Sequence, residues 1–315
     1  MKYLFTFLTI LGFNSASISQ NLQPREGYVN VEGGRIWYKI VGKGKKTPLL
    51  LIHGGPGSSS CAGIPGYSLL SDDRPVIFYD QLGSGHSDRP TDTLLWKLPR
   101  FVNEIVGLRN ALGLKKLHVL GSSWGATVLI EYMLTKKPKG IMSVIFSGPL
   151  LSTPLWIEDA KILLTKLPEN IQDTIRKYET LKDYNSLQYI AATDSFYARF
   201  MSVKQWPDVP PSTCDGVLGF NDAVYNYMWG PTEFNAPGTL KNFDRTGDLY
   251  KLKQAVLFIG GRYDEVRPET IYKFQKLVPK SKAVIIENAG HYKIIDQPLK
   301  FTSAIRKFLN GVELK

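Results

Sequence analysis

The residues with the clearest chemical potential in this sequence are a serine between two glycines and a histidine far downstream. Gly121-Ser122-Ser123-Trp124-Gly125 fits the pattern Gly-x-Ser-x-Gly and lies between a short apolar run and a helical pattern. A tight strand-to-helix turn needs small residues here because neighbouring backbones pass close by, and it exposes the serine hydroxyl at the helix N-terminus. We therefore predict that Ser123 is a nucleophile.

A serine hydroxyl reacts well only when a base removes its proton. Of the four histidines in the chain, only His291 follows Ser123, as the order serine, acid, histidine requires. Asp264 follows an apolar run between the two and is the expected acid, with its neighbour Glu265 as the alternative. This acid would accept a hydrogen bond from the imidazole and stabilise its protonated form.

Acyl transfer also needs two backbone N–H groups that bind the developing oxyanion. The residue after the nucleophile, Trp124, is expected to supply one of them. The glycine-rich loop His53-Gly54-Gly55-Pro56-Gly57 follows an apolar run, and Gly55 is the expected second donor. Glycines let the backbone approach a substrate carbonyl closely.

Short apolar runs that alternate with helical patterns position these residues. Such runs are typical of a parallel sheet covered on both faces, and the loops at the carboxyl ends of its strands carry function. The runs are residues 48–52, 75–79, 117–120, 143–146, 255–259 and 283–286. Helices are expected over about 96–112, 126–135 and 299–309, and two short strands over 28–41.

The segment 150–243 breaks this rhythm, because it has helical patterns and many aromatic residues but no strand signal. We interpret it as a mainly helical cap over the strand ends, inserted between core segments 25–149 and 244–315. The alternative is a separate all-α domain without a role in the site. Both ends of the segment must return to one sheet, which favours the cap.

The first 19 residues have a positive start, an apolar run and then small residues. This layout predicts a secretory signal peptide and an exported protein, periplasmic or secreted, with no stable membrane insertion after its removal. The alternative is a buried N-terminal helix. Export would permit a disulfide between the two cysteines, Cys61 and Cys214, which the sequence neither requires nor excludes.

The net charge of +11 is scattered over turns and element ends, without a basic stripe or a nucleic-acid motif. We therefore expect no nucleic-acid partner. No metal-ligand or cofactor motif is present either, so no cofactor and no metal are expected. The sequence carries no indication of the oligomeric state.

Several motifs, taken in order, resemble the proline iminopeptidase (prolyl aminopeptidase) family of α/β-hydrolase serine peptidases, over roughly residue 27 to the C-terminus. The glycine-rich loop at residues 53–57 and the Ser-Trp turn at 121–125 are two of them. The others are Asp80-Gln81-Leu82-Gly83-Ser84-Gly85-His86-Ser87, Met228-Trp229-Gly230-Pro231-Thr232-Glu233-Phe234 and Gly261-Arg262-Tyr263-Asp264-Glu265.

The resemblance implies an α/β-hydrolase fold and release of an N-terminal residue, often proline, from a small peptide substrate. It also implies that Glu233 in the cap and Glu265 beside the acid bind the substrate amino group. A carboxylate suits that role because charge-assisted hydrogen bonds are about twice as strong as neutral ones.

The sequence departs from the common family pattern at Leu82, where many members have Arg, and at Tyr292-Lys293 after the histidine. We expect neither departure to touch the catalytic residues, but both leave the substrate preference open. An esterase or amidase on the same three residues is the alternative, and it would need no cap carboxylate. A non-catalytic binding protein is the third possibility, disfavoured by the intact serine, acid and histidine.

Overall fold

The computed structural model describes residues 22–204 and 219–314. The predicted signal peptide and Cys214 lie outside these described residues. Within the described ranges, none of the helices combines the length and the apolar character of a membrane span.

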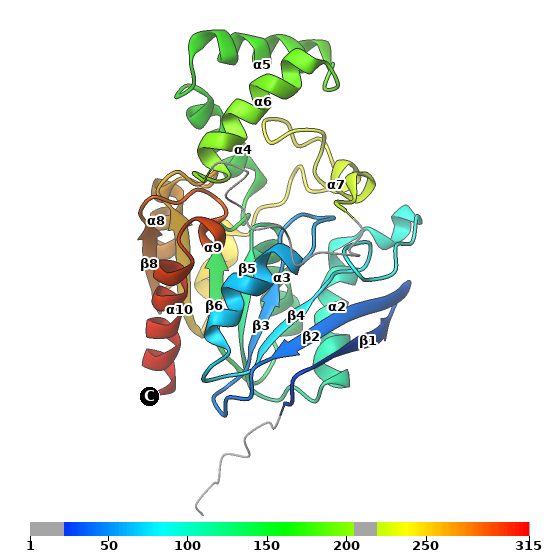
Figure 1. Cartoon of the computed structure of the whole chain (residues 1–315), viewed down its shortest axis with the longest axis vertical. Coiled ribbons are helices and arrows are strands. Elements are labelled where there is room, and N and C mark those ends of the chain that lie inside the picture. Colours follow the sequence, from blue (N-terminus) through cyan, green and yellow to red (C-terminus); the bar gives the residue numbers. More distant parts are fainter. Residues whose placement is uncertain (1–21, 205–218, 315) are drawn as a thin grey trace, which may run out of the picture.

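A single sheet of eight strands runs through the described part of the chain, in the order β1-β2-β4-β3-β5-β6-β7-β8 (Figure 1). Its first two strands form a hairpin that pairs antiparallel with β4, whereas all the other neighbours are parallel. The strands are β1 (Arg25–Val31), β2 (Gly34–Val41), β3 (Leu49–Ile52), β4 (Val76–Tyr79), β5 (Leu117–Ser122), β6 (Ile141–Ser147), β7 (Ala255–Gly261) and β8 (Ser281–Ile286).

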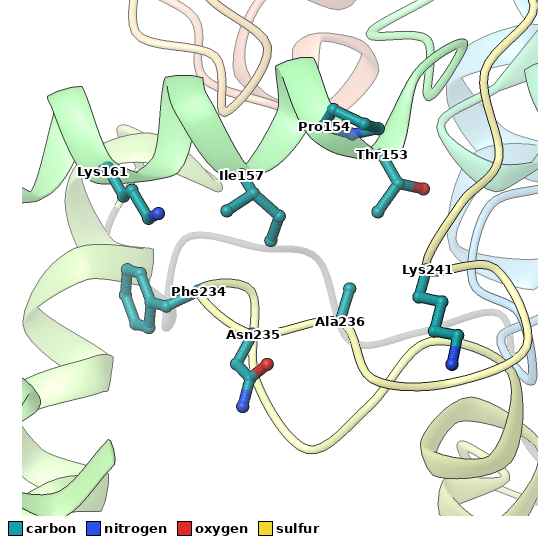
Figure 2. A pocket seen from close by; sticks show the side chains of 8 residues that line it. All are labelled: Thr153, Pro154, Ile157, Lys161, Phe234, Asn235, Ala236 and Lys241. Atoms are coloured by element: carbon teal, nitrogen blue, oxygen red, sulfur yellow. The ribbon is translucent and has the colours of Figure 1, made fainter. Parts of the chain in front are cut away.

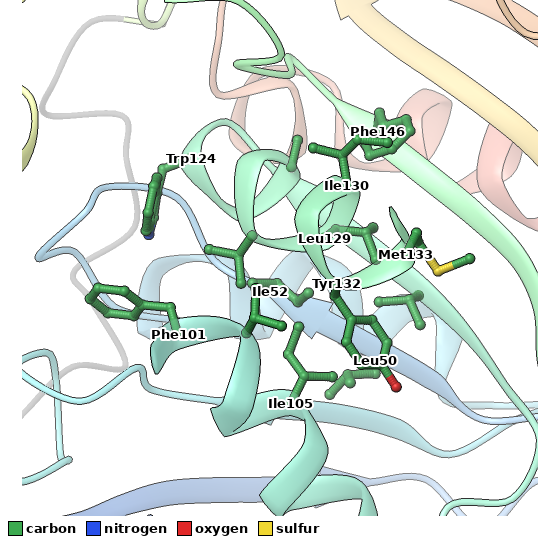
Figure 3. Close-up of a cluster of buried hydrophobic side chains, with 14 of the residues drawn as sticks. Leu50, Ile52, Phe101, Ile105, Trp124, Leu129, Ile130, Tyr132, Met133 and Phe146 are labelled. Atoms are coloured by element: carbon green, nitrogen blue, oxygen red, sulfur yellow. The ribbon is translucent and has the colours of Figure 1, made fainter. Parts of the chain in front are cut away.

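Helices cover both faces of this sheet, which is why its central strands are mostly apolar. On β3, Leu50 and Ile52 point to one face and Leu49 and Leu51 belong to the cluster on the other. The first face packs against α2 (Leu98–Ala111), α3 (Trp124–Lys136) and α8 (Pro268–Lys276), and the second against α1 (Ile64–Tyr67) and α10 (Pro298–Glu313). Figure 3 shows side chains of α2 and α3 meeting those of β3.

The connection from β6 to β7 rises above the carboxyl ends of the strands (Figure 1). It contains α4 (Thr153–Leu164), α5 (Glu169–Leu181), α6 (Leu187–Phe200) and α7 (Asp222–Met228). The helices α4, α5 and α6 share a small apolar cluster of their own around Phe196. A β-bridge between Ser152 and Asp244 joins the two ends of the connection. The segment predicted as a cap, 150–243, has these four helices and no strand among its described residues.

The predicted mostly parallel sheet flanked by helices is confirmed, with small shifts at helix ends. Helix α2 begins at Leu98 rather than at residue 96, since residues 93–95 form a separate 3-10 turn and Pro99 suits a first helical turn. Helix α3 begins two residues earlier than predicted, directly after Ser123. A short helix, α9 (Lys293–Asp296), precedes α10.

Candidate active site

Ser123 joins β5 to α3 at the carboxyl edge of the sheet, with φ 53° and ψ −122°. This strained conformation requires close packing on both sides. A Cβ atom at Gly121 would lie 2.4 Å from the Gly125 carbonyl oxygen, and one at Gly125 would lie 2.2 Å from the Ile52 carbonyl oxygen. Both glycines of the sequence pattern are therefore required by the turn itself.

The two predicted oxyanion donors lie on either side of this turn. Trp124 is the first residue of α3, so its peptide N–H has no partner within the helix. In the facing loop Gly55 has φ 112°, which only glycine adopts readily, and Gly54 packs directly on the nucleophile. A Cβ atom at Gly54 would lie 3.2 Å from Ser123 Cβ.

A buried glutamine fastens this loop to the helix. The Trp124 indole donates a hydrogen bond to Gln81 Oε1 over 2.8 Å, and Gln81 Nε2 donates to the His53 carbonyl over 2.9 Å. The Gln81 backbone N–H donates to His53 Nε2. Gln81, from the family-like segment at 80–87, thus fixes the relative position of the two predicted donors.

The predicted acid and base meet above β7 and β8. His291 Nδ1 lies 2.7 Å from Asp264 Oδ1, and both side chains are buried. The same carboxylate accepts hydrogen bonds from the backbone N–H groups of Gly261 and Val266. Burial alone would raise the pKa of Asp264, but Lys293 and His291 outweigh it and lower that pKa to about 2.

Lys293 corrects one expectation from the sequence. We expected the Tyr292-Lys293 pair not to touch the catalytic residues, yet Lys293 Nζ lies 2.6 Å from Asp264 Oδ2 and 2.8 Å from the His291 carbonyl oxygen. The lysine is only 1% exposed. The sequence shows its position two residues after the histidine but not the inward direction of its side chain.

Gly148 connects the serine turn to the histidine. The Ser123 N–H donates to the Ser147 carbonyl over 2.9 Å, and the next residue, Gly148, lies against the imidazole. A Cβ atom at Gly148 would lie 2.9 Å from His291 Cε1. The chain thus brings Ser123, Asp264 and His291 together at one edge of the sheet.

Glu233, from the loop after α7, is buried and reaches back toward the histidine. It accepts hydrogen bonds from Trp156 Nε1 over 3.0 Å and from the Tyr225 hydroxyl. Trp156 of α4 also contacts the His291 ring edge-on, with 5.6 Å between the ring centroids. Burial raises the pKa of Glu233, although these hydrogen bonds and His291 oppose the rise.

Glu265 is buried next to Asp264, and its Oε1 atom has no hydrogen-bond partner. Burial, the Glu233 charge and the Asp264 charge together raise its pKa well above the usual range. The structure therefore brings both predicted amino-group ligands into one buried site, where they form a carboxylate pair with an unused acceptor.

An open hollow of about 320 Å³ borders this site without including any of the predicted site residues (Figure 2). It lies between α4 and the loop that carries Glu233, with Phe234 and Ile157 on its walls. Among the described residues, no group of three or more His, Cys, Asp or Glu side chains could hold a metal ion.

The fold, with a serine turn at the carboxyl edge of its sheet, defines an α/β hydrolase. A family model described as alpha/beta hydrolase fold matches residues 47–298, and the chain belongs to the proline iminopeptidase branch of this family. A proline iminopeptidase from Heyndrickxia coagulans is 44% identical over 91% of this chain and 99% of its own length.

Two further relatives agree with this assignment. A proline iminopeptidase from Clostridium botulinum is 34% identical over 90% of this chain and 98% of its own. The crystal structure of a proline iminopeptidase from Mycobacterium smegmatis has a TM-score of 0.82 at 27% identity, over 92% of this chain and 99% of that one. The predicted family, fold class and aminopeptidase function are confirmed by these relatives.

Proposed function

We propose that this enzyme releases the N-terminal residue, proline above all, from short peptides through an acyl-enzyme at Ser123. The observation that carries the proposal is the buried pair of Glu233 and Glu265 beside the histidine. A buried carboxylate without a full set of partners is costly unless a cation joins it. The protonated amino terminus of a peptide is such a cation.

The number of donors on that terminus supports proline as the first residue. A protonated N-terminal proline nitrogen carries two N–H donors, and the two carboxylates offer one acceptor group to each. Any other terminus carries a third N–H. Trp156 and Trp229, whose rings meet edge-on at 6.1 Å, and the Tyr225 ring provide apolar surface for a pyrrolidine ring nearby.

Acyl transfer then follows from the arrangement around Ser123. His291 takes the hydroxyl proton as Oγ attacks the first carbonyl carbon, while Asp264 stabilises the imidazolium. The Trp124 and Gly55 N–H groups bind the oxyanion. His291 next gives its proton to the leaving amine, and a water molecule hydrolyses the ester in the same way. This releases the first residue and restores the serine.

A panel of aminoacyl β-naphthylamides tests the proposal. Prolyl-β-naphthylamide is expected to be cleaved fastest, alanyl and leucyl substrates more slowly, and N-acetylated substrates not at all, since acetylation removes the ammonium charge. Equal cleavage of free and acetylated substrates would show an esterase or amidase instead.

The role of Ser123 is tested separately with an uncharged fluorophosphonate probe, which reacts with activated serines and needs no amino group. Labelling is expected in the wild type and not in Ser123→Ala. A wild-type protein that resists the probe at every pH would refute the acyl-enzyme mechanism.

We also propose that the enzyme is exported, on the basis of the leader-like residues 1–19. N-terminal sequencing of the protein recovered from periplasm or medium is expected to begin near residue 20. Recovery only from the cytoplasm, with residue 2 or Met1 at its start, would contradict export.

A further inference from the structure

A buried lysine contacts the predicted acid through Asp264 Oδ2, the carboxylate oxygen that the His291 ring does not contact. Lysine is almost never fully buried unless it is paired, because removing an ammonium from water is costly. Here Lys293 Nζ has two close oxygen partners, Asp264 Oδ2 at 2.6 Å and the His291 carbonyl at 2.8 Å. The two Asp264 oxygens thus face different cationic or hydrogen-bonding partners, imidazole on Oδ1 and ammonium on Oδ2.

The neighbouring backbone leaves room for this ammonium. Gly148 has φ 52°, and a Cβ atom there would lie 2.7 Å from Lys293 Nζ. Lys293 is also the first residue of α9, and the preceding Tyr292 N–H is held by the Met201 carbonyl over 2.7 Å. The inward position of the lysine is therefore fixed by the loops on both sides of it.

We propose that Lys293 is a positioning residue whose charge, acting through Asp264, keeps His291 available as a base at acidic pH. The proposal rests on the proposed roles of Asp264 and His291 in acyl transfer. A carboxylate alone favours protonation of the imidazole beside it. An ammonium on the other oxygen offsets part of that effect, so the imidazole stays neutral to lower pH.

The size of the effect follows from the geometry. Lys293 Nζ and His291 Nδ1 lie 2.7 and 3.0 Å from one point, the Cβ position of Gly148, so they are at most about 6 Å apart. Two unit charges at that separation and an effective dielectric constant of about 20 change a protonation midpoint by about two pH units. An effective dielectric constant of about 40 would halve this change, so the expected shift is about one to two units.

Other ionisable groups lie near Asp264 and His291, and the experiment must distinguish their effects from that of Lys293. Glu265 follows Asp264 directly and interacts with the Lys293 charge, and Glu233 interacts electrostatically with His291. Both glutamates would shape the pH profile of any substrate that carries an ammonium. An uncharged fluorophosphonate has no ammonium, so its reaction with Ser123 reports the base without requiring the amino-group site.

The experiment measures the second-order rate of fluorophosphonate labelling against pH for the wild type, Lys293→Met and Lys293→Gln. Methionine removes both the charge and the donor, whereas glutamine removes the charge and keeps an N–H donor. In both variants the acidic limb of the profile is expected to move to higher pH by about one to two units. Thermal unfolding and circular dichroism establish that each variant is folded.

Each outcome has a definite meaning. Profiles of both variants that overlay the wild type would overturn the inference, while Ser123 labelling in the wild type would leave the proposed function standing. A shift in Lys293→Met but none in Lys293→Gln would also overturn it, because the hydrogen bond rather than the charge would then be responsible. If the methionine variant does not fold, the glutamine variant decides the question.

Discussion

Replacement of Glu233 by glutamine tests the amino-group site most directly, because the change removes a charge and little else. Glutamine has the same shape, and its carbonyl can still accept the hydrogen bond from Trp156. Its NH₂ group can donate to the Tyr225 hydroxyl, which then acts as an acceptor. The variant is therefore expected to fold normally but to lack the negative charge of Glu233.

The expected loss can be worked out from the site. An ammonium about 4 Å from a carboxylate gains about 4 kcal/mol at an effective dielectric constant of about 20. Glu265 remains and carries part of this interaction, which leaves a loss of about 2–3 kcal/mol, within the range for removing one partner of a buried charge pair. This corresponds to a decrease of about 30- to 160-fold in kcat/KM for prolyl-β-naphthylamide.

The assay compares two reactions of the same variant. Hydrolysis of prolyl-β-naphthylamide is expected to fall by that factor, whereas labelling by the uncharged fluorophosphonate is expected to stay within about threefold of the wild type. Glu287→Gln is the matched control, since it removes an exposed carboxylate that pairs with Arg262. An equal loss in both reactions would refute the reasoning, because Glu233 would then act on the acyl-transfer residues.

Three further predictions concern Gly148, the two buried glutamates and Glu313. Gly148→Ala is expected to lower kcat/KM at least tenfold with the fold retained, because the added methyl group displaces the ammonium and imidazole that lie within 3 Å; unchanged kinetics would contradict this. Substrate binding is expected to release protons and to strengthen from acid to neutral pH, since burial raises the pKa values of Glu233 and Glu265 and the Glu233 charge raises that of Glu265 further; calorimetry in buffers of different ionisation enthalpy measures it. Burial raises the pKa of Glu313, but hydrogen bonds from His118 and Arg74 outweigh this and lower that pKa from 4.5 to about 2. The charged Glu313 therefore stabilises the folded protein above pH 4.5, and this contribution is lost as the pH falls toward 2. Glu313→Gln is expected to cost about 1–2 kcal/mol in urea unfolding at neutral pH and little near pH 2.

Most of the sheet could be predicted because its physical cause is visible in the sequence. Parallel strands buried on both faces are mainly apolar, so each appears as a short apolar run. The serine turn could be predicted for a similar reason, since Gly121 and Gly125 have no room for a side chain. Burial of a strand and close packing of a turn both restrict residue types at neighbouring positions, so both can be recognised in the sequence.

The contacts that complete the site have no such local pattern. Trp156 and Glu233 are 77 residues apart and meet only because the connection between β6 and β7 folds back on itself. Lys293 is near His291 in sequence, but its inward direction depends on space left by Gly148, which follows β6. Nothing in the local sequence distinguishes it from a solvated lysine, which is the usual state of that residue.

The buried charges of the site divide into two groups with different tasks. Lys293 neutralises Asp264, so the acid that orients His291 adds little net charge to its surroundings. Among the described residues neither Glu233 nor Glu265 forms an ion pair; the Lys293 charge only partly offsets the rise in the pKa of Glu265, which keeps an acceptor without a partner. A substrate ammonium therefore gains most by joining the glutamates and least by approaching the neutralised aspartate. This difference would place the amino terminus beside Glu233 and Glu265 and leave the first carbonyl carbon to face Ser123, the geometry that an aminopeptidase requires.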